Sequence, residues 1–193
     1  MTTTISIPDE NRRIDGATEI SAFLSPFGIE YQRWPLAERV DPDASPEEIL
    51  AAYALELRII MERGGFVTAD VINVTPDTPN LEAMLDRFRK EHTHSEDEVR
   101  FILKGRGIFH IHPESGPVFA IQVEGGDLIN VPKGTRHWFD LCEERSIRAI
   151  RMFQDKTGWT PHYTEENAAA GYAPLCWGPT HLPPRQREGG LQT

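Results

Sequence analysis

The chain is poor in cysteine, has no long apolar run and lacks an excess of basic residues. Each shortage narrows the classes of protein to which the chain can belong. Its 193 residues include only two cysteines, Cys142 and Cys176, which do not form a CxxC pair. Although one disulfide could form, we expect free thiols in a reducing compartment. No apolar run approaches the ~20 residues of a membrane-spanning helix. Residues 1–10 lack the basic start and apolar core of a secretory signal, so we expect a cytoplasmic protein.

The charge balance is acidic, with a formal net charge of −10 at pH 7. Nucleic acids and anionic membranes are bound by basic surfaces, so neither is an expected partner. A content of 39% hydrophobic and 26% charged residues is typical of a globular domain with a full core. Four of the seven histidines fall between residues 92 and 112, which makes this stretch the first place to look for a functional site.

The first ninety residues predict an α/β segment, with helices where apolar residues recur every three to four positions and strands where they alternate. The clearest helix start is Ser45, followed by a proline in the first turn and a glutamate three residues after the cap. The expected elements are a helix over 18–27, a strand over 29–34, a helix from 46 to about 63, a strand over 66–74 and a helix from 81 onward. The residues expected to be buried on the two later helices are Leu50, Tyr53, Ala54, Leu57 and Ile60, and then Leu81, Met84, Leu85 and Phe88.

The next part of the chain changes to short strands separated by turn signals, which is typical of an all-β barrel or sandwich. The expected strands are 118–123, 127–131, 136–141 and 146–153, and the expected turns are 105–107, 113–117, 125–126 and 132–135. The sequence therefore predicts one domain over 1–176, mainly β with flanking helices: an N-terminal α/β extension over 1–90, a barrel core over 91–155 and a C-terminal extension over 156–176. Residues 177–193 have little to bury, and we expect a mobile tail there.

The strongest chemical signal is the run EHTHSEDEVR at residues 91–100. Side chains alternate along an extended chain, so His92 and His94 point to the same side. Glu98 adds a carboxylate four residues after His94. Two neutral imidazoles and one carboxylate form a ligand set that divalent iron, nickel or manganese accepts with positions left open.

Two further residues belong to the predicted site. His137 begins a strand after a tight turn, where it can be aimed inward as a third imidazole ligand. Arg100 is in phase with Glu98 and brings a guanidinium beside that ligand. Glu96 and Asp97 are competing carboxylates that spacing alone does not exclude. The histidines interpreted as non-ligands are His110 and His112, expected as a solvated pair beside a surface turn, and His162 and His181, in polar or proline-rich surroundings.

The spacing of these residues resembles the two-part signature of the cupins. The first part is HxHxxxE at 92–98, followed by six residues and Gly105, and the second is GxxxxxPxGxxH at 126–137. Leu141 stands where the signature has an asparagine, but that position is not a metal ligand. The resemblance implies a cupin-type double-stranded β-helix, a small jelly-roll-like barrel.

Over roughly residues 27–173 the chain also resembles the acireductone dioxygenases of the methionine salvage pathway. The stretch EHTHSEDEVRF at 91–101 looks like the metal motif of that family. Supporting stretches are DLINVP at 127–132, HWFD at 137–140 and IRMF at 150–153 with GW at 158–159, and in the N-terminal half RW at 33–34, AAY at 51–53 and DVI at 70–72.

This resemblance implies an enzyme that cleaves the acireductone 1,2-dihydroxy-3-keto-5-methylthiopentene with O2. In that family iron(II) gives formate and 2-keto-4-methylthiobutyrate, whereas nickel(II) gives formate, carbon monoxide and 3-methylthiopropionate. One Fe2+ or Ni2+ per chain would be held by His92, His94, Glu98 and His137. The alternatives are another cupin metalloenzyme that uses the same three histidines and glutamate, such as a different dioxygenase or an isomerase, and a non-catalytic binding cupin, against which the full ligand set counts.

The resemblance also implies roles for residues around the ligands. Arg100 would bind the substrate and help to generate its dianion, Glu91 would take part in metal incorporation, and Asp97 would relay local conformational changes. Phe139, in phase with His137, is a candidate wall for the methylthio tail. An ordinary surface carboxylate is the alternative for Glu91 and Asp97, and barrel core is the alternative for Phe139. The expected partners are a small acireductone and O2, and we expect a monomer.

Overall fold

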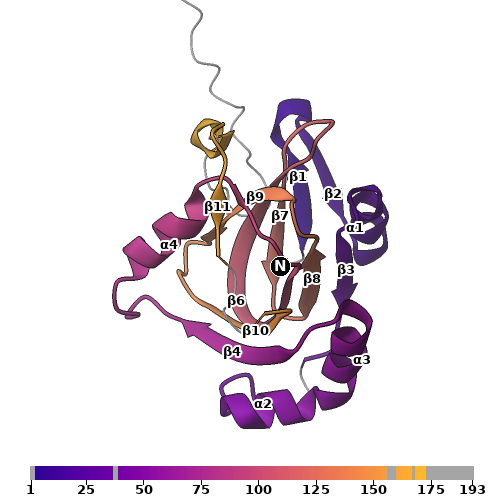
Figure 1. Ribbon diagram of the computed structural model, residues 1–193, viewed down its shortest axis with the longest axis vertical. Coiled ribbons are helices and arrows are strands. Elements are labelled where there is room, and N and C mark those ends of the chain that lie inside the picture. Colours follow the sequence, from indigo (N-terminus) through magenta and orange to yellow (C-terminus); the bar gives the residue numbers. More distant parts are fainter. Residues whose placement is uncertain (1–2, 37–38, 156–159, 167, 173–193) are drawn as a thin grey trace, which may run out of the picture.

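The centre of the computed structural model is one long strand, β6 (Glu98–His112), which two antiparallel sheets share (Figure 1). Its first half pairs with β8 (Asp127–Val131) and β10 (Ile147–Phe153). Its second half pairs with β7 (Phe119–Glu124) and β9 (Arg136–Leu141), so the four strands predicted after residue 117 are confirmed. The structure describes residues 3–36, 39–155, 160–166 and 168–172.

Residues 105–107, which we expected to form a turn, lie inside β6. Gly105 has a φ of 79°, and the pairing of β6 with β10 skips Leu103, two residues earlier, because Arg148 pairs with Lys104 and Ala149 with Ile102. A Cβ atom at Gly105 would collide with the backbone carbonyl of Ser146. The strand therefore bulges at Leu103 and bends at the left-handed Gly105 that follows, so it passes from one sheet into the other instead of ending.

The N-terminal segment adds a hairpin that the sequence did not predict. β1 (Thr4–Ile7) pairs with β2 (Arg12–Asp15) and also extends the sheet beside β7. α1 (Ala17–Leu24) and β3 (Glu30–Arg33), which pairs with β8, confirm the first expected helix and strand. Gly28 separates them in a left-handed conformation.

The predicted helix after Ser45 is divided in two. Ser45 and Glu48 form the expected capping box of α2 (Pro46–Ala52), but Tyr53 leaves the helical conformation before α3 (Ala54–Gly64) begins. The break changes which side chains are buried: Ile49, Tyr53, Leu57 and Ile60 face the core, whereas Leu50 is half-buried and Ala54 is exposed. Both helices pack on the side of the sheet that β4 (Thr68–Val74) extends by pairing with β10 (Figure 1).

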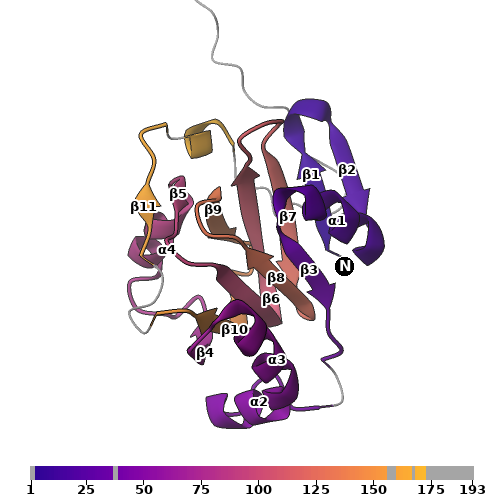
Figure 2. The same ribbon diagram turned by 45° about the vertical axis from the view of Figure 1, so that its right-hand side comes forward.

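α4 (Leu81–Arg89) leads the chain into β5 (His92–Thr93). β5 lies between β9 and β11 (His162–Tyr163), at one end of the sheet that carries β7 (Figure 2). The apolar stripe predicted for this helix faces the core, where Leu81 and Leu85 are buried and Met84 and Phe88 pack against them.

The remaining expectations concern the cysteines, the tail, the division of the domain and membrane-spanning helices. Cys142 is buried and disulfide-bonded, which corrects the expectation of a free thiol. Cys176, His181 and the predicted tail over 177–193 lie outside the described residues, and the predicted division into core and extensions stays a prediction. Among the described residues, no helix has the length and apolar character needed to cross a membrane.

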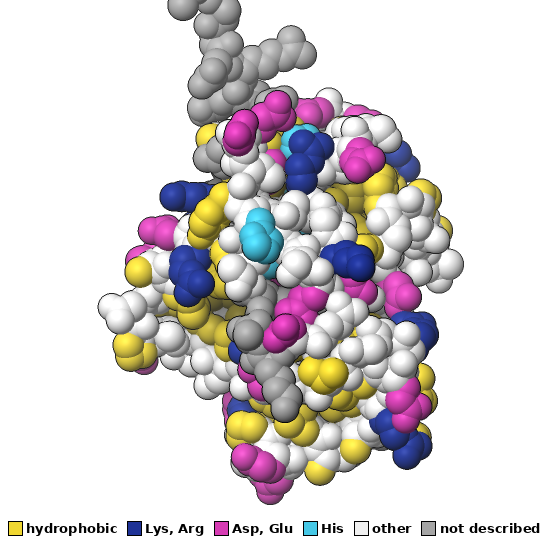
Figure 3. Space-filling model, in the orientation of Figure 1, with side chains coloured by type: hydrophobic (Ala, Val, Ile, Leu, Met, Phe, Trp, Pro, Cys, Tyr) yellow, Lys and Arg dark blue, Asp and Glu magenta, His cyan; other side chains and the backbone are white. Residues whose placement is uncertain are grey.

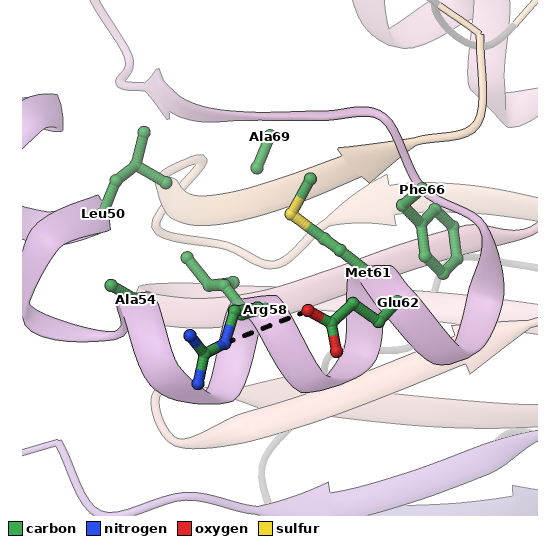
Figure 4. A pocket seen from close by; sticks show the side chains of 8 residues that line it. Leu50, Ala54, Arg58, Met61, Glu62, Phe66 and Ala69 are labelled. Atoms are coloured by element: carbon green, nitrogen blue, oxygen red, sulfur yellow. Dashed lines mark ion pairs between the residues drawn. The ribbon is translucent and has the colours of Figure 1, made fainter.

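An apolar hollow of about 480 Å³ lies between the helices α2 and α3 and strand β4 (Figure 4). Arg58 and Glu62 form an ion pair of 4.0 Å along its edge. Its lining includes Leu50, Met61 and Phe66 but none of the predicted ligands, so it is separate from the candidate metal site. On the face seen in Figure 3, lysine and arginine side chains are scattered among aspartate and glutamate.

Candidate metal centre

The structure brings the three predicted histidine ligands together. His92 on β5 pairs directly with His137 on β9, and His94 follows just after β5. Ligand atoms of the three side chains all lie within 4.8 Å of one another. The exposed fractions of His92, His94 and His137 are 1%, 4% and 2%, so the cluster is shielded from water.

Hydrogen bonds to backbone carbonyls fix the tautomer of each ring. Nδ1 of His92 lies 2.6 Å from the Lys90 carbonyl, and Nδ1 of His137 lies 2.8 Å from the Thr135 carbonyl. Nδ1 of His94 lies 3.0 Å from the carbonyl of Thr160. Because a carbonyl only accepts, each Nδ1 carries the proton, and the lone pair of each neutral imidazole is on Nε2. This is the arrangement that orients histidines as metal ligands.

Glu98 completes a set of four converging side chains. Its Oε2 lies 3.0 Å from Nε2 of His137 and 3.2 Å from Nε2 of His94. A carboxylate oxygen and two imidazole lone pairs repel one another unless a proton or a cation lies between them. Three imidazole nitrogens and one carboxylate are a donor set for a divalent transition metal, so these residues fit a bound ion.

The charges around Glu98 set the protonation of the cluster. Burial acts to raise the pKa of Glu98, but the Arg100 guanidinium and the two histidines outweigh it and hold that pKa well below its usual value. Burial and the nearby His137 lower the pKa of His92 to about 4. The pKa of His94 is raised although burial opposes this, because His94 contacts Glu98 directly. The cluster thus keeps its carboxylate ionised and His92 neutral, as a metal requires.

Arg100 is held between the ligand set and two aromatic rings. Its Nε donates to Oε1 of Glu98 at 2.7 Å. Its guanidinium carbon lies 5.5 Å from the ring centre of Phe109 and 4.8 Å from that of Phe139. The predicted proximity of Arg100 to Glu98 is therefore confirmed. Neither Phe109 nor the part of Thr160 in orienting His94 could be predicted from the sequence, because both act through contacts between distant segments.

The two competing carboxylates face away from the histidines. Glu96 accepts hydrogen bonds from the backbone N–H groups of Gln154 and Asp155. Asp97 accepts from the backbone N–H of Lys133 at 2.9 Å, in the turn that precedes His137.

We expected His110 and His112 to be a solvated pair, and the structure corrects this expectation. His110 is 1% exposed and stacks on Trp138, with ring centres 4.9 Å apart and planes inclined by 6°. His112 bonds through Nδ1 to Oε2 of Glu91 at 2.7 Å. Neither belongs to the histidine cluster, and His162 is exposed outside it. Glu91 is itself 1% exposed, which removes the surface alternative for this carboxylate.

Two antiparallel sheets that enclose three histidines and a glutamate define a metal-binding protein of the cupin type. The family model described as ARD/ARD′ family matches residues 10–161. The chain belongs to this family, the acireductone dioxygenases.

Relatives and a solved structure agree with this assignment. The acireductone dioxygenase of Picosynechococcus sp. is 42% identical over 172 residues, which cover 89% of this chain and 97% of the relative. That of Pseudomonas syringae pv. tomato is 40% identical over 89% of this chain and 94% of its own. The structure of acireductone dioxygenase from Bacillus anthracis, with a cadmium ion in its active centre, has a TM-score of 0.79 and 38% identity, and the match covers 84% of this chain and 98% of that one.

Proposed function

We propose that the protein is a metal-dependent dioxygenase that cleaves the acireductone 1,2-dihydroxy-3-keto-5-methylthiopentene with O2. The observation that carries this proposal is the convergence of His92, His94, His137 and Glu98 in one buried cluster, with Arg100 bonded to the carboxylate. Relatives about 40% identical over most of the chain are named acireductone dioxygenases. We place the reaction in methionine salvage, in the cytoplasm, with the protein acting as a monomer.

In this proposal the three histidines and Glu98 hold one Fe2+ or Ni2+ per chain. When bound, the ion would supply Lewis acidity, which favours ionisation of an ene-diol. The protein contributes the fixed Nε2 lone pairs and keeps water out of the cluster. With iron the proposed products are formate and 2-keto-4-methylthiobutyrate. With nickel they are formate, carbon monoxide and 3-methylthiopropionate. Either set contains all the atoms of the acireductone and of one O2.

Arg100 has the clearest role beside the ligands. A guanidinium is charged at any working pH, so it stabilises negative charge that forms on a substrate oxygen next to Glu98. The hydrogen bond to Glu98 fixes one edge of the group, and burial to 6% exposure strengthens its field. Phe139 lies beside the guanidinium and, in our proposal, also forms the apolar wall that receives the methylthio tail.

Glu91 and Asp97 are proposed to act on the metal site without binding the ion. The carboxylate of Glu91, buried next to His92, links His112 to Thr164, and we propose that it takes part in metal incorporation. Asp97 adjoins Glu98 and bonds to the turn before His137, which gives it the connection that a relay between the two halves of the site needs.

The test is metal analysis followed by aerobic turnover of the iron-loaded and nickel-loaded protein. We expect about one ion per chain, oxygen consumption and formate from both forms, with keto acid from iron and carbon monoxide from nickel. His94→Ala should lose the metal and the turnover together, whereas the exposed His162→Ala serves as the matched control and should lose neither. Turnover by metal-free His94→Ala would refute the site, and bound metal without oxygen consumption would refute the substrate.

A further inference from the structure

Arg100 is positioned by aromatic side chains as well as by its bond to Glu98. The rings of Phe109 and Phe139 are in contact with each other, with centres 4.8 Å apart, and the guanidinium lies within cation–π distance of both. Phe139 is 4% exposed, so its ring is enclosed by the protein. The orientation of the guanidinium therefore depends on where this ring is held.

Gly107 on β6 decides where the ring of Phe139 lies. A Cβ atom at Gly107 would lie well inside 3.0 Å of both Cζ and Cε2 of that ring, a separation that real Cβ atoms do not show. Gly107 is not among the residues with positive φ, so the backbone does not demand glycine here. Glycine is needed here because a larger side chain would occupy the space of the phenyl ring tip, which contacts the strand at this point.

We infer that Gly107 is a positioning residue of the active site. By leaving room for the tip of Phe139, it lets the face of that ring cover the Arg100 guanidinium and hold it beside Glu98. The inference depends on the proposed function in one respect: Arg100 is the group that stabilises the substrate anion. An added methyl group displaces the ring, because the ring tip is the movable partner and the paired strand is not. The guanidinium then loses its fixed orientation while the four ligands keep theirs.

The test is Gly107→Ala, compared with Gly64→Ala as a matched control. A Cβ atom at Gly64 meets the ring of Phe66 as closely, but at the end of α3 and outside the ligand cluster. We expect Gly107→Ala to bind the same amount of iron or nickel as the unmodified protein and to lose about a hundredfold in kcat/KM, as misplacement of a catalytic group does. Gly64→Ala should retain kcat/KM within about threefold, since its clash lies outside the site.

A spectroscopic measurement tests the positioning independently of the substrate. In metal-free protein the Arg100 Nε–H, bonded to buried Glu98, should give a slowly exchanging 15N–1H signal shifted by the two rings, assigned by its loss in Arg100→Lys. Gly107→Ala should move or broaden this signal, and Gly64→Ala should not. If the unmodified enzyme fails to turn over the acireductone but the signal responds as stated, the proposed function falls and the positioning role stands.

A double-substitution cycle shows whether the effect travels through the ring. Leucine at position 139 is small enough to accommodate the new methyl group, so Gly107→Ala should cause almost no further loss once Phe139→Leu is present. The inference is overturned if alanine at position 107 lowers kcat/KM equally in both backgrounds, or if folded Gly107→Ala leaves the Arg100 signal unchanged.

Discussion

His110 should make the folded protein sensitive to acid, and replacing it should remove that sensitivity. The side chain is fully buried against Trp138, and its Nδ1 has no hydrogen-bond partner among the described residues. Burial lowers the pKa of His110 to about 3, from an ordinary value of 6.5. The folded protein therefore favours the neutral ring, and protonation of His110 destabilises the folded state.

The size of the effect follows from the two pKa values. Between pH 6.5 and pH 3 the unfolded chain binds a proton at this histidine that the folded chain does not bind, so stability falls as the pH falls through this window. At pH 7 the loss of unfolding free energy caused by His110 is almost absent, and at pH 5 it reaches roughly 2 kcal/mol. His110→Phe keeps a planar ring beside Trp138 and cannot take up a proton. We expect its stability at pH 7 to be within about 1 kcal/mol of the unmodified protein.

The assay is equilibrium unfolding in urea of metal-free protein at pH 7 and pH 5. Metal-free samples are needed because protonation of the ligands would otherwise release the ion and add its own pH dependence. The unmodified protein should lose roughly 2 kcal/mol more than His110→Phe between the two pH values, since all other titrating groups are shared. The exposed His162→Phe is the matched control and should behave as the unmodified protein does. An equal loss in His110→Phe and the unmodified protein would refute the reasoning.

Three further predictions concern stability. Gly105→Ala should lower the free energy of unfolding by about 3 kcal/mol, because alanine is strained at this positive φ and its Cβ meets the Ser146 carbonyl; urea unfolding at neutral pH measures this. Tyr53→Phe should raise the same free energy by about 1 kcal/mol, because the Tyr53 hydroxyl is buried without a partner among the described residues. Removing the metal with a chelator should lower the melting temperature, since an ion present at about 100 times its Kd stabilises the folded state by about 2.7 kcal/mol; an unchanged melting temperature would contradict a folded-state metal site.

The histidine ligands could be predicted because the signal is local. Alternation along an extended chain brings His92 and His94 to one side, and a tight turn leads directly into His137; the same alternation brought Arg100 beside Glu98. None of these inferences depends on which strands pair with each other.

The errors occurred where distant pairing decides the outcome. A glycine with positive φ suits a turn and a bent strand equally, and only the pairing of β6 with both sheets shows that the strand continues through Gly105. The interpretation of His110 as solvated failed for a related reason. Alternation separates the two faces of a strand, but it does not reveal that the outer face is covered, here by Trp138 and by Tyr172 near the C-terminus.

The same distinction between local and distant contacts runs through the metal centre itself. His92 and His137 are each oriented by the carbonyl two residues earlier, so the chain around each ligand fixes its tautomer. His94 is oriented by Thr160, which lies far along the sequence, and the strand that follows Thr160 is paired with β5. Two of the three imidazoles are therefore oriented by their own segments of the chain. The third is prepared only when the C-terminal segment is in place, so the complete ligand set is a property of the folded chain and not of the motif alone.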